Sequence, residues 1–368
     1  MKILVLSKRH NMGMDSFGSR HGRMYSLPNS LHHQGHRVVC AVGDYHGTEP
    51  AAFPAGDLEW TSIPLKQAGF PRPDRYWRHA RQTCQHLGPD CIWAGSDAFH
   101  LIAGHRLAAR YRLPFVCDLK DNYEHFTLTR IPGLYHLYLR ALRAATAITC
   151  ASEPLIDYAR ARSSAPTVLI PNAAPAEFAR VAQTRDARDL RHLLGLPTDT
   201  PLLGTTGALT RRRGIGTITE GMDQLASSYP DACLVTAGRP DEHWTPPSRA
   251  PHVHLGELPY DRIPYLLAAL DIGIICNQDN KFGRYCYPQK YSEMLATGLP
   301  MIVAKTGIFS NDDPATGVLA RFEPGSPEDF ARAAVNALQQ APRHAPTGSP
   351  STWNERGALL QHVLTRST

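Results

Sequence analysis

One stretch of the sequence, residues 287–304, constrains the fold more than any other. It reads YPQKYSEMLATGLPMIVA and predicts a loop, a helix, a tight turn and a buried strand. Pro288 suits the first turn of a helix, because the N–H that proline lacks would be unpaired there in any case. Gly298 suits a helix C-cap, and Pro300 prevents the helix from continuing. The apolar run that follows, 301–304, is typical of a strand inside a parallel sheet.

The first two turns of this expected helix carry a cation and a carboxylate, Lys290 and Glu293. Because they are three residues apart, both side chains lie on one face of the helix. The start of a helix also offers unpaired backbone N–H groups and the positive end of the helix dipole. Together these groups are suited to binding a phosphorylated sugar ring.

Short apolar runs alternate with amphipathic stretches along the chain, which predicts parallel sheets with helices on both faces. The pattern occurs twice, separated by a polar, Arg- and Asp-rich connection around 181–199. We expect strands at 3–6, 38–42, 91–94, 115–118, 148–150 and 168–170, then at 202–205, 233–237, 253–255, 272–276 and 301–303. Expected helices are 98–110, 135–144, 215–228, 262–269, 288–297 and 327–339.

Two α/β domains therefore follow: residues 1–180 and residues 181–350. Residues 341–350 are rich in Pro, Ser, Thr and Gly and read as a linker. The last segment, 351–368, has helical spacing. It packs either on its own domain or on the first one.

Composition fits a globular chain of this kind. The 368 residues leave room for two cores, and 42% hydrophobic and 20% charged residues are ordinary values. No segment approaches the roughly 18 apolar residues of a membrane span. The N-terminus reads as a first strand and not as a signal peptide, so we expect a cytoplasmic protein.

Charge is unevenly distributed along the chain. Residues 1–180 hold 21 Lys and Arg against 14 Asp and Glu, a net +7, whereas the remainder carries −1. A basic first half could bind an anionic acceptor or make peripheral contact with the inner membrane face. The alternative is a solvated Arg-rich surface without a binding role. No basic motif typical of nucleic-acid binding is present.

Metal binding is not expected. The eight cysteines are scattered, without a Cys-x-x-Cys pair or zinc spacing, and read as buried reduced thiols. The 18 histidines contain no His-Glu-x-x-His arrangement.

The spacing Pro-x-Lys-x-x-Glu at 288–293, followed by Ala-x-Gly-x-Pro at 296–300, resembles the donor-binding signature of nucleotide-sugar-dependent glycosyltransferases of GT-B architecture, particularly family 4. The resemblance implies two Rossmann-like domains and a final helix, 351–368, that crosses back to the first. It implies transfer of a sugar to a hydroxyl of a glycan, lipid-linked or small-molecule acceptor. A nucleotide-diphosphate sugar would be the co-substrate, with no cofactor or metal, and the anomeric configuration would be retained.

The resemblance also assigns roles in the second domain. Segment 206–215 resembles the family's strand-to-helix turn, where a basic residue binds the donor diphosphate; Arg213 stands at that position. Glu293 stands where a glutamate binds the ribose, whereas the family's preceding glutamate is replaced by Tyr285. Asn280, Lys281 and Arg284 are further candidates for the sugar-contacting role. The complete donor-side set is Gly207, Arg212, Arg213, Gly238, Arg239, Gly283, Tyr285, Lys290 and Glu293.

In the first domain, segment 114–122 resembles the family's acceptor-side strand and loop. Asp121 is the preferred candidate for activating the acceptor or positioning the sugar, and its alternative role is that of a helix cap. Asp118 and His21 are further catalytic candidates. The loop 8–22 resembles the family's flexible acceptor-side loop, with Gly13, Asp15 and Gly18 as its candidates.

Other functions remain open on the same fold. A nucleotide-sugar 2-epimerase would need acid and base residues that the sequence does not locate. A non-catalytic nucleotide-sugar-binding protein would need none. A nicotinamide dehydrogenase is disfavoured, because the first strand is not followed by a Gly-x-Gly-x-x-Gly turn.

Overall fold

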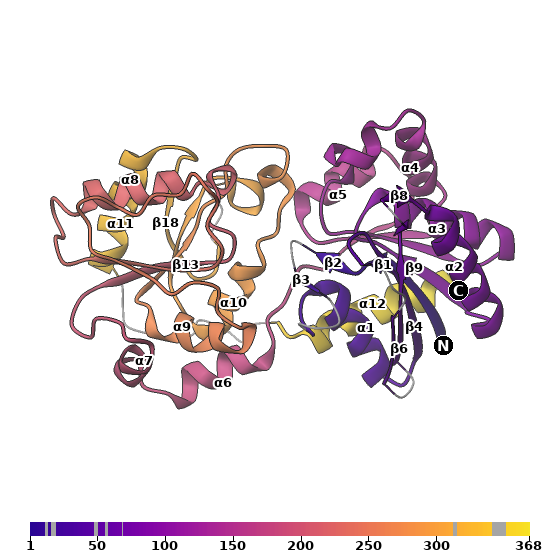
Figure 1. Ribbon diagram of the computed structural model, residues 1–368, viewed down its shortest axis with the longest axis horizontal. Coiled ribbons are helices and arrows are strands. Elements are labelled where there is room, and N and C mark those ends of the chain that lie inside the picture. The colour runs from indigo at the N-terminus through magenta and orange to yellow at the C-terminus, as the bar shows by residue number, and fades with distance from the viewer. Residues whose placement is uncertain are drawn as a thin grey trace. The chain divides into compact units, whose positions relative to one another are not determined.

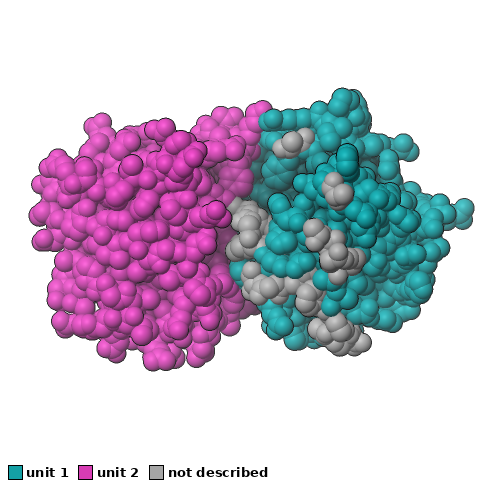
Figure 2. Space-filling model, viewed as in Figure 1, with its two compact units in different colours: residues 1–172, 285–287, 353–368 teal, residues 173–284, 288–352 magenta. Residues whose placement is uncertain are grey.

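A computed structural model gives the structure of the chain and describes residues 1–11, 14–15, 20–47, 51–55, 58–67, 69–311, 315–340 and 351–368. The chain forms two compact units (Figure 2). Unit 1 comprises residues 1–172, 285–287 and 353–368, and unit 2 comprises residues 173–284 and 288–352.

Unit 1 is built on a mainly parallel sheet. Within the described residues the sheet has eight strands in the order β12-β11-β10-β9-β1-β4-β6-β5, and only the edge strand β5 runs antiparallel to its neighbour. The strands are β1 (Lys2–Lys8), β4 (Arg37–Asp44), β5 (Ala51–Ala55), β6 (Leu58–Pro64), β9 (Cys91–Ala94), β10 (Phe115–Leu119), β11 (Ala147–Cys150) and β12 (Thr167–Leu169). Two small hairpins are β2 (His10–Asn11) with β3 (Met14–Asp15), and β7 (Lys66–Gln67) with β8 (Phe70–Pro71).

Helices cover this sheet (Figure 1). They are α1 (Arg23–His33), α2 (Pro73–Leu87), α3 (Ala98–Tyr111), α4 (Leu134–Arg143), α5 (Glu153–Arg160) and α12 (Trp353–Ser367), with short 3₁₀ turns η1 (Tyr123–His125) and η2 (Thr127–Arg130). A buried core joins the strands to α2, α3, α4 and α5. The last helix, α12, packs beside the first, α1.

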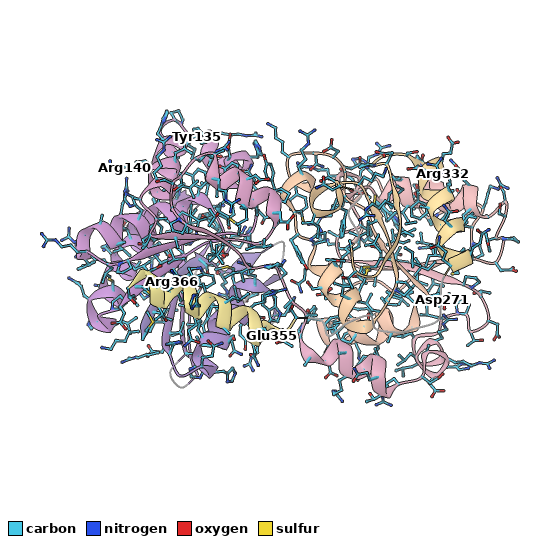
Figure 3. All side chains as sticks on the ribbon, turned by 180° about the vertical axis from the view of Figure 1, so that it is seen from behind. Tyr135, Arg140, Asp271, Arg332, Glu355 and Arg366 are labelled. Atoms are coloured by element: carbon cyan, nitrogen blue, oxygen red, sulfur yellow. The ribbon has the colours of Figure 1, made fainter. Side chains whose placement is uncertain are left out.

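Charge placement favours α12 as a helix. Glu355 lies in its first turn and Arg366 in its last, as Figure 3 shows from behind. A carboxylate near the N-terminus and a cation near the C-terminus both interact favourably with the helix dipole. Unit 1 contains both residues 1–172 and α12, with unit 2 between them in the sequence.

Unit 2 is a second parallel sheet. Its strand order in the described residues is β15-β14-β13-β16-β17-β18. The strands are β13 (Leu202–Thr206), β14 (Cys233–Ala237), β15 (His252–His254), β16 (Ile272–Ile275), β17 (Met301–Ala304) and β18 (Val318–Phe322). In Figure 1, α8 (Ile215–Leu225) and α11 (Pro327–Gln340) lie on one face of the sheet; on the other lie α6 (Ala176–Thr184), α7 (Ala187–Leu194), α9 (Ile263–Ala269) and α10 (Gln289–Thr297). Short 3₁₀ turns are η3 (Arg211–Arg213), η4 (Tyr260–Arg262), η5 (Gly283–Tyr285) and η6 (Gly307–Phe309).

The prediction of two parallel-sheet α/β units is confirmed, and every expected strand is present to within one or two residues. The expected polar connection at 181–199 is not a bare linker, because it contains α7. Helix α6 spans the expected boundary at residue 180 and packs with α9 and α10 of unit 2. The expected linker, 341–350, lies outside the described residues.

Candidate functional site

Two glycines bring the carboxyl ends of β13 and β14 close together. The backbone φ angles of Gly207 and Gly238 are +94° and +137°, a region that side chains disfavour. A Cβ atom at Gly238 would collide with the carbonyl of Gly207. The Gly207 N–H donates to the carbonyl of Ala237 at 2.8 Å, and the Gly238 N–H to that of Gly256 at 2.7 Å. Glycine is therefore required at both strand ends.

A small pocket lies beside these strand ends in unit 2. Arg213 and Lys290 both line it, together with Thr205, Ala208, Leu209, Ile215, Ile218 and Cys276. The Lys290 ammonium donates to the Thr205 hydroxyl at 3.1 Å, and that hydroxyl donates to the carbonyl of Ile274 at 2.9 Å. These bonds hold one cation at the end of β13 and in the first turn of α10.

The turn η3 places Arg213, the second cation of the pocket. Its guanidinium carbon lies 5.3 Å from the centre of the Phe282 ring, within the range of cation–π attraction. The next residue, Gly214, has a φ of +82°, and the thiol of Cys276 donates to its carbonyl at 3.4 Å. A Cβ at Gly214 would strike the Cys276 sulfur, so the turn fits closely against β16.

Glu293 lies one turn beyond Lys290 on α10. Its side chain is buried, and the Tyr260 hydroxyl donates to its Oε1 at 2.9 Å. Burial raises the pKa of Glu293, opposed in part by hydrogen bonds from Tyr260 and Gln289 and by the charge of Lys290. Phe178 packs against Tyr260, with 5.7 Å between the ring centres. Sequence reasoning missed Tyr260, which begins the short turn η4 a few residues after β15.

The other donor-side candidates of unit 2 lie around this pocket with different roles. The side chains of Arg212 and Arg239 are exposed, and their carbonyls accept hydrogen bonds from Asn280 and from the Leu209 N–H. The Gly283 N–H donates to the Asn280 side chain at 3.0 Å. The Asn280 bonds hold the loop ahead of α10, whereas the bond between Leu209 and Arg239 joins the segments that follow β13 and β14.

The loop preceding α10 also supplies three residues, 285–287, to unit 1. The ring of Tyr285 lies against those of Tyr158 and His125, at 5.8 Å and 6.5 Å between centres. Its carbonyl accepts a hydrogen bond from the Ser152 hydroxyl at 2.7 Å. Tyr285 is therefore packed among residues of unit 1.

Asp118, a catalytic candidate, ends β10 in a buried ion pair. Its oxygens accept from Arg23 at 2.6 Å and from Thr149 at 2.6 Å, and neither Asp118 nor Arg23 is appreciably exposed. Arg23 also donates to the carbonyl of Ile170 at 2.5 Å. This arrangement ties the start of α1 to β10, β11 and the end of β12. Sequence reasoning missed Arg23, because 95 residues separate it from its partner.

The remaining acceptor-side candidates differ in their surroundings. Asp121 lies half-buried on the loop after β10, next to Lys120. Asp15 forms an ion pair with Arg9 at 2.7 Å. His21 is half-buried and precedes Gly22, the N-cap residue of α1. Gly13 and Gly18 lie outside the described residues.

The described residues offer neither a cluster of metal ligands nor a membrane-spanning helix. No group of three or more His, Cys, Asp or Glu side chains is placed to hold a metal ion in this part of the chain. None of the helices in the same residues combines the length and the apolar character needed to cross a bilayer. All eight cysteines are free thiols, and seven of them are buried.

The two parallel-sheet units define the GT-B class of fold. Residues 23–173 match the family model described as "Glycosyl transferase 4-like domain", which confirms the resemblance for this part of unit 1. The chain is 24% identical over 201 residues to a Bacillus subtilis (strain 168) protein named as teichuronic acid biosynthesis glycosyltransferase TuaC. That match covers 53% of this chain and 48% of the relative, so the chain spans about half the length of the curated relative it matches.

Solved structures share the whole fold. Sucrose-phosphate synthase from Thermosynechococcus elongatus aligns with a TM-score of 0.74 and 16% identity, covering 99% of this chain and 96% of the other. Anabaena Alr3699/HepE in complex with UDP aligns at 0.65 and 17% identity, over 100% and 95% of the two chains. The catalytic domain of starch synthase IV from Arabidopsis thaliana, bound to ADP and acarbose, aligns at 0.67 and 14% identity, over 100% and 99%.

Proposed function

We propose that this protein is a glycosyltransferase that moves a sugar from a nucleotide-diphosphate sugar to an acceptor hydroxyl in glycan, glycolipid or glycosylated-metabolite biosynthesis. One observation carries the proposal. Arg213 and Lys290, which are far apart in the sequence, line one pocket at the end of β13 and beside the first turn of α10. Two cations and a helix N-terminus match the charge of a diphosphate.

The reaction breaks the bond between the anomeric carbon and the diphosphate oxygen and forms one to the acceptor oxygen. The diphosphate gains negative charge as it departs, and Arg213 and Lys290 would stabilise that charge. Electrostatic stabilisation by these cations supports a metal-independent reaction. Glu293 would bind the ribose, and the resemblance to family 4 favours retention of the anomeric configuration.

The acceptor hydroxyl must lose a proton in this reaction. In a retaining enzyme the departing diphosphate takes that proton, and Asp121 of unit 1 would position the sugar. In an inverting enzyme Asp121 would be the general base. We assign Asp118 a structural role in either case, because its carboxylate already pairs with Arg23 in the interior.

In this proposal the nucleotide of the donor is a uridine or adenosine diphosphate. Two structures of similar fold support this choice of nucleotide: Anabaena Alr3699/HepE is in complex with UDP, and starch synthase IV is bound to ADP. The acceptor could be lipid-linked, and the basic character of residues 1–180 supports peripheral contact with an anionic membrane face.

Release of nucleotide diphosphate tests the function directly. Purified protein is incubated with UDP- or ADP-sugars, with and without candidate acceptors, and the free UDP or ADP is measured. We expect release that depends on the acceptor and falls sharply in Arg213→Ala. Inversion at C2 of the donor sugar without release would indicate an epimerase. Nucleotide binding without any turnover would indicate a non-catalytic binding protein.

A further inference from the structure

The carboxylate of Glu293 is held by a tyrosine from a different element of unit 2. Tyr260 begins the turn η4, 33 residues before Glu293 in the sequence, and its hydroxyl donates to Glu293 Oε1 at 2.9 Å. Glu293 lies three residues after Lys290, so the carboxylate shares a face of α10 with an ammonium that lines the unit 2 pocket. The bond from Tyr260 therefore acts on the charged neighbour of a pocket-lining residue.

The ring of Tyr260 is itself anchored. Phe178 of α6, which is only 1% exposed, packs on this ring with 5.7 Å between the ring centres. The turn η4 continues directly into α9, and α6, α9 and α10 pack against one another on one face of the sheet (Figure 1). A hydroxyl on a packed ring donates in a restricted range of directions, so this bond fixes the orientation of the carboxylate that accepts it.

The bond also favours the charged form of Glu293. Glu293 is only 5% exposed, and burial raises its pKa. The hydrogen bonds from Tyr260 and Gln289 and the charge of Lys290 oppose that rise. Burial, together with the charge of Glu293, raises the pKa of Tyr260, so its hydroxyl stays protonated and remains a donor. Without this donor the carboxylate would take up a proton more readily.

We propose that Tyr260 is a positioning residue of the donor site, whose hydroxyl orients the Glu293 carboxylate toward the hydroxyls of the donor ribose. The inference rests on the proposed ribose-binding role of Glu293, and nucleotide binding can test it without turnover. Tyr260 acts through Glu293 and does not touch the ribose. A carboxylate that is misdirected or protonated accepts fewer hydrogen bonds from the ribose, so removal of the Tyr260 hydroxyl should weaken recognition of the ribose specifically.

Calorimetry on the full-length protein measures this recognition. The ligands are UDP and ADP and their 2′,3′-dideoxy analogues, which lack both ribose hydroxyls. We expect the wild type to bind UDP or ADP about tenfold or more tightly than the analogue, because the analogue leaves the carboxylate unpaired. In Tyr260→Phe this ribose preference should fall about three- to tenfold, while the affinity for the analogue stays near the wild-type value. An equal loss for both ligands would overturn the proposal.

Two features of the variants guard against a general effect on folding. Tyr260→Phe retains the ring that packs on Phe178, so we expect it to fold. Tyr229→Phe is the matched control, because it removes a hydroxyl from another half-buried tyrosine of unit 2, one that packs against the core of that unit. The control should keep the full ribose preference. A similar loss of preference in the control would refute the role of Tyr260.

A double-mutant cycle shows whether Tyr260 acts through Glu293. Glu293→Ala should lose the ribose preference, and adding Tyr260→Phe to it should have no further effect. A further loss would contradict the positioning role. If Glu293→Ala loses the preference and Tyr260→Phe alone does not, the ribose role of Glu293 stands and the inference about Tyr260 fails. If the wild type binds neither nucleotide, the donor function itself is refuted, and the inference with it.

The pH dependence of the ribose preference gives a readout that a merely structural role would not move. The bond from Tyr260 lowers the pKa of Glu293, so its removal should raise that pKa. On acidification, Tyr260→Phe should therefore lose the preference at a higher pH than the wild type. The comparison with the dideoxy analogue cancels the titration of the phosphates, which both ligands share. The groups facing Glu293 are Tyr260 from η4, and Gln289 and Lys290 on α10. Identical pH profiles, measured below the melting temperature of the variant, would contradict the proposal.

Discussion

At the scale of single residues, Glu293 combines the ribose-binding role that we propose with a cost in stability. Its folded-state pKa is raised by burial, so the ionised form costs free energy that is absent below its unfolded pKa and fully present above its folded pKa. Glu293→Gln removes the charge and retains an oxygen for Tyr260. We expect this variant to melt at or above the wild-type temperature at pH 8, and to lose that advantage as the pH falls toward 4.5. Thermal unfolding across this range is the measurement.

The same Glu293→Gln variant should bind nucleotide diphosphate more weakly if Glu293 holds the ribose. Calorimetry with UDP and ADP measures this, and unchanged affinity for both would remove Glu293 from the donor site. A higher melting temperature with weaker nucleotide binding would separate its functional role from a structural one.

Arg213 and Lys290 should act on the diphosphate and not on the nucleoside. Replacing either by Ala removes charged hydrogen bonds worth about 1.5–3 kcal/mol. We expect lower turnover and weaker binding of UDP or ADP, with little change in the affinity for uridine or adenosine. An equal loss for nucleoside and nucleotide would indicate that the residue shapes the pocket instead.

Asp121→Asn tests the acceptor side. If Asp121 is a general base, its loss should reduce the rate about 10²–10⁴-fold. Donor binding and the melting temperature should stay close to wild type, since the side chain is only half-buried. Near-normal turnover would exclude Asp121 as the general base and leave Asp15 and His21 as the candidates for that role.

At the scale of secondary-structure elements, Arg23 ties α1 to the sheet of unit 1. Removing one partner of a buried ion pair leaves the other charge buried, at a cost of about 3–5 kcal/mol. Arg23→Ala should therefore lower the melting temperature strongly. Arg37→Ala is the control, since its pair with Glu59 is about half exposed and such pairs contribute about 0–1 kcal/mol. Similar melting temperatures for both variants would argue against this role of Arg23.

Elements with strong local signals could be predicted from the sequence, and those with weak ones could not. The strands at 91–94 and 301–304 are uninterrupted apolar runs, so they were readily recognised. The strand β6 alternates buried and half-buried residues near the sheet edge and lacks such a run. Helix α7 has a polar, Arg-rich sequence that reads as a linker, although Asp186 caps its N-terminus.

The residues of the candidate site also differ in whether the sequence alone could predict them. Lys290, Glu293 and Arg213 lie in local motifs whose spacing is visible in the sequence. Tyr260 and Arg23 act through partners 33 and 95 residues away, and only folding brings those pairs together. Tyr285 stands at an expected donor position, but its ring packs among aromatic residues of unit 1.

At the scale of the whole molecule, the positive charge of residues 1–180 predicts attraction to anionic membranes. Arg130, Ile131, Arg140 and Arg143 are exposed along α4 and the segment before it, and Figure 3 labels Arg140 with Tyr135 on this helix. We expect the protein to sediment with phosphatidylserine-containing vesicles at low salt and to be released at high salt. Arg140→Gln with Arg143→Gln should weaken this binding, about 1 kcal/mol per charge. Equal binding to neutral vesicles would exclude the electrostatic mechanism.

The division of the chain into units has a consequence for biosynthesis. Unit 1 needs residues 353–368, whereas unit 2 is complete once residue 352 has been made. On the ribosome the unit that begins first is therefore the last to be finished, and α1 emerges more than 300 residues before α12, the helix it packs against. A nascent chain has to keep the α1 face of its first sheet soluble throughout the synthesis of unit 2. Premature termination near residue 350 would leave that apolar surface uncovered and make the truncated product a target for chaperones and proteases.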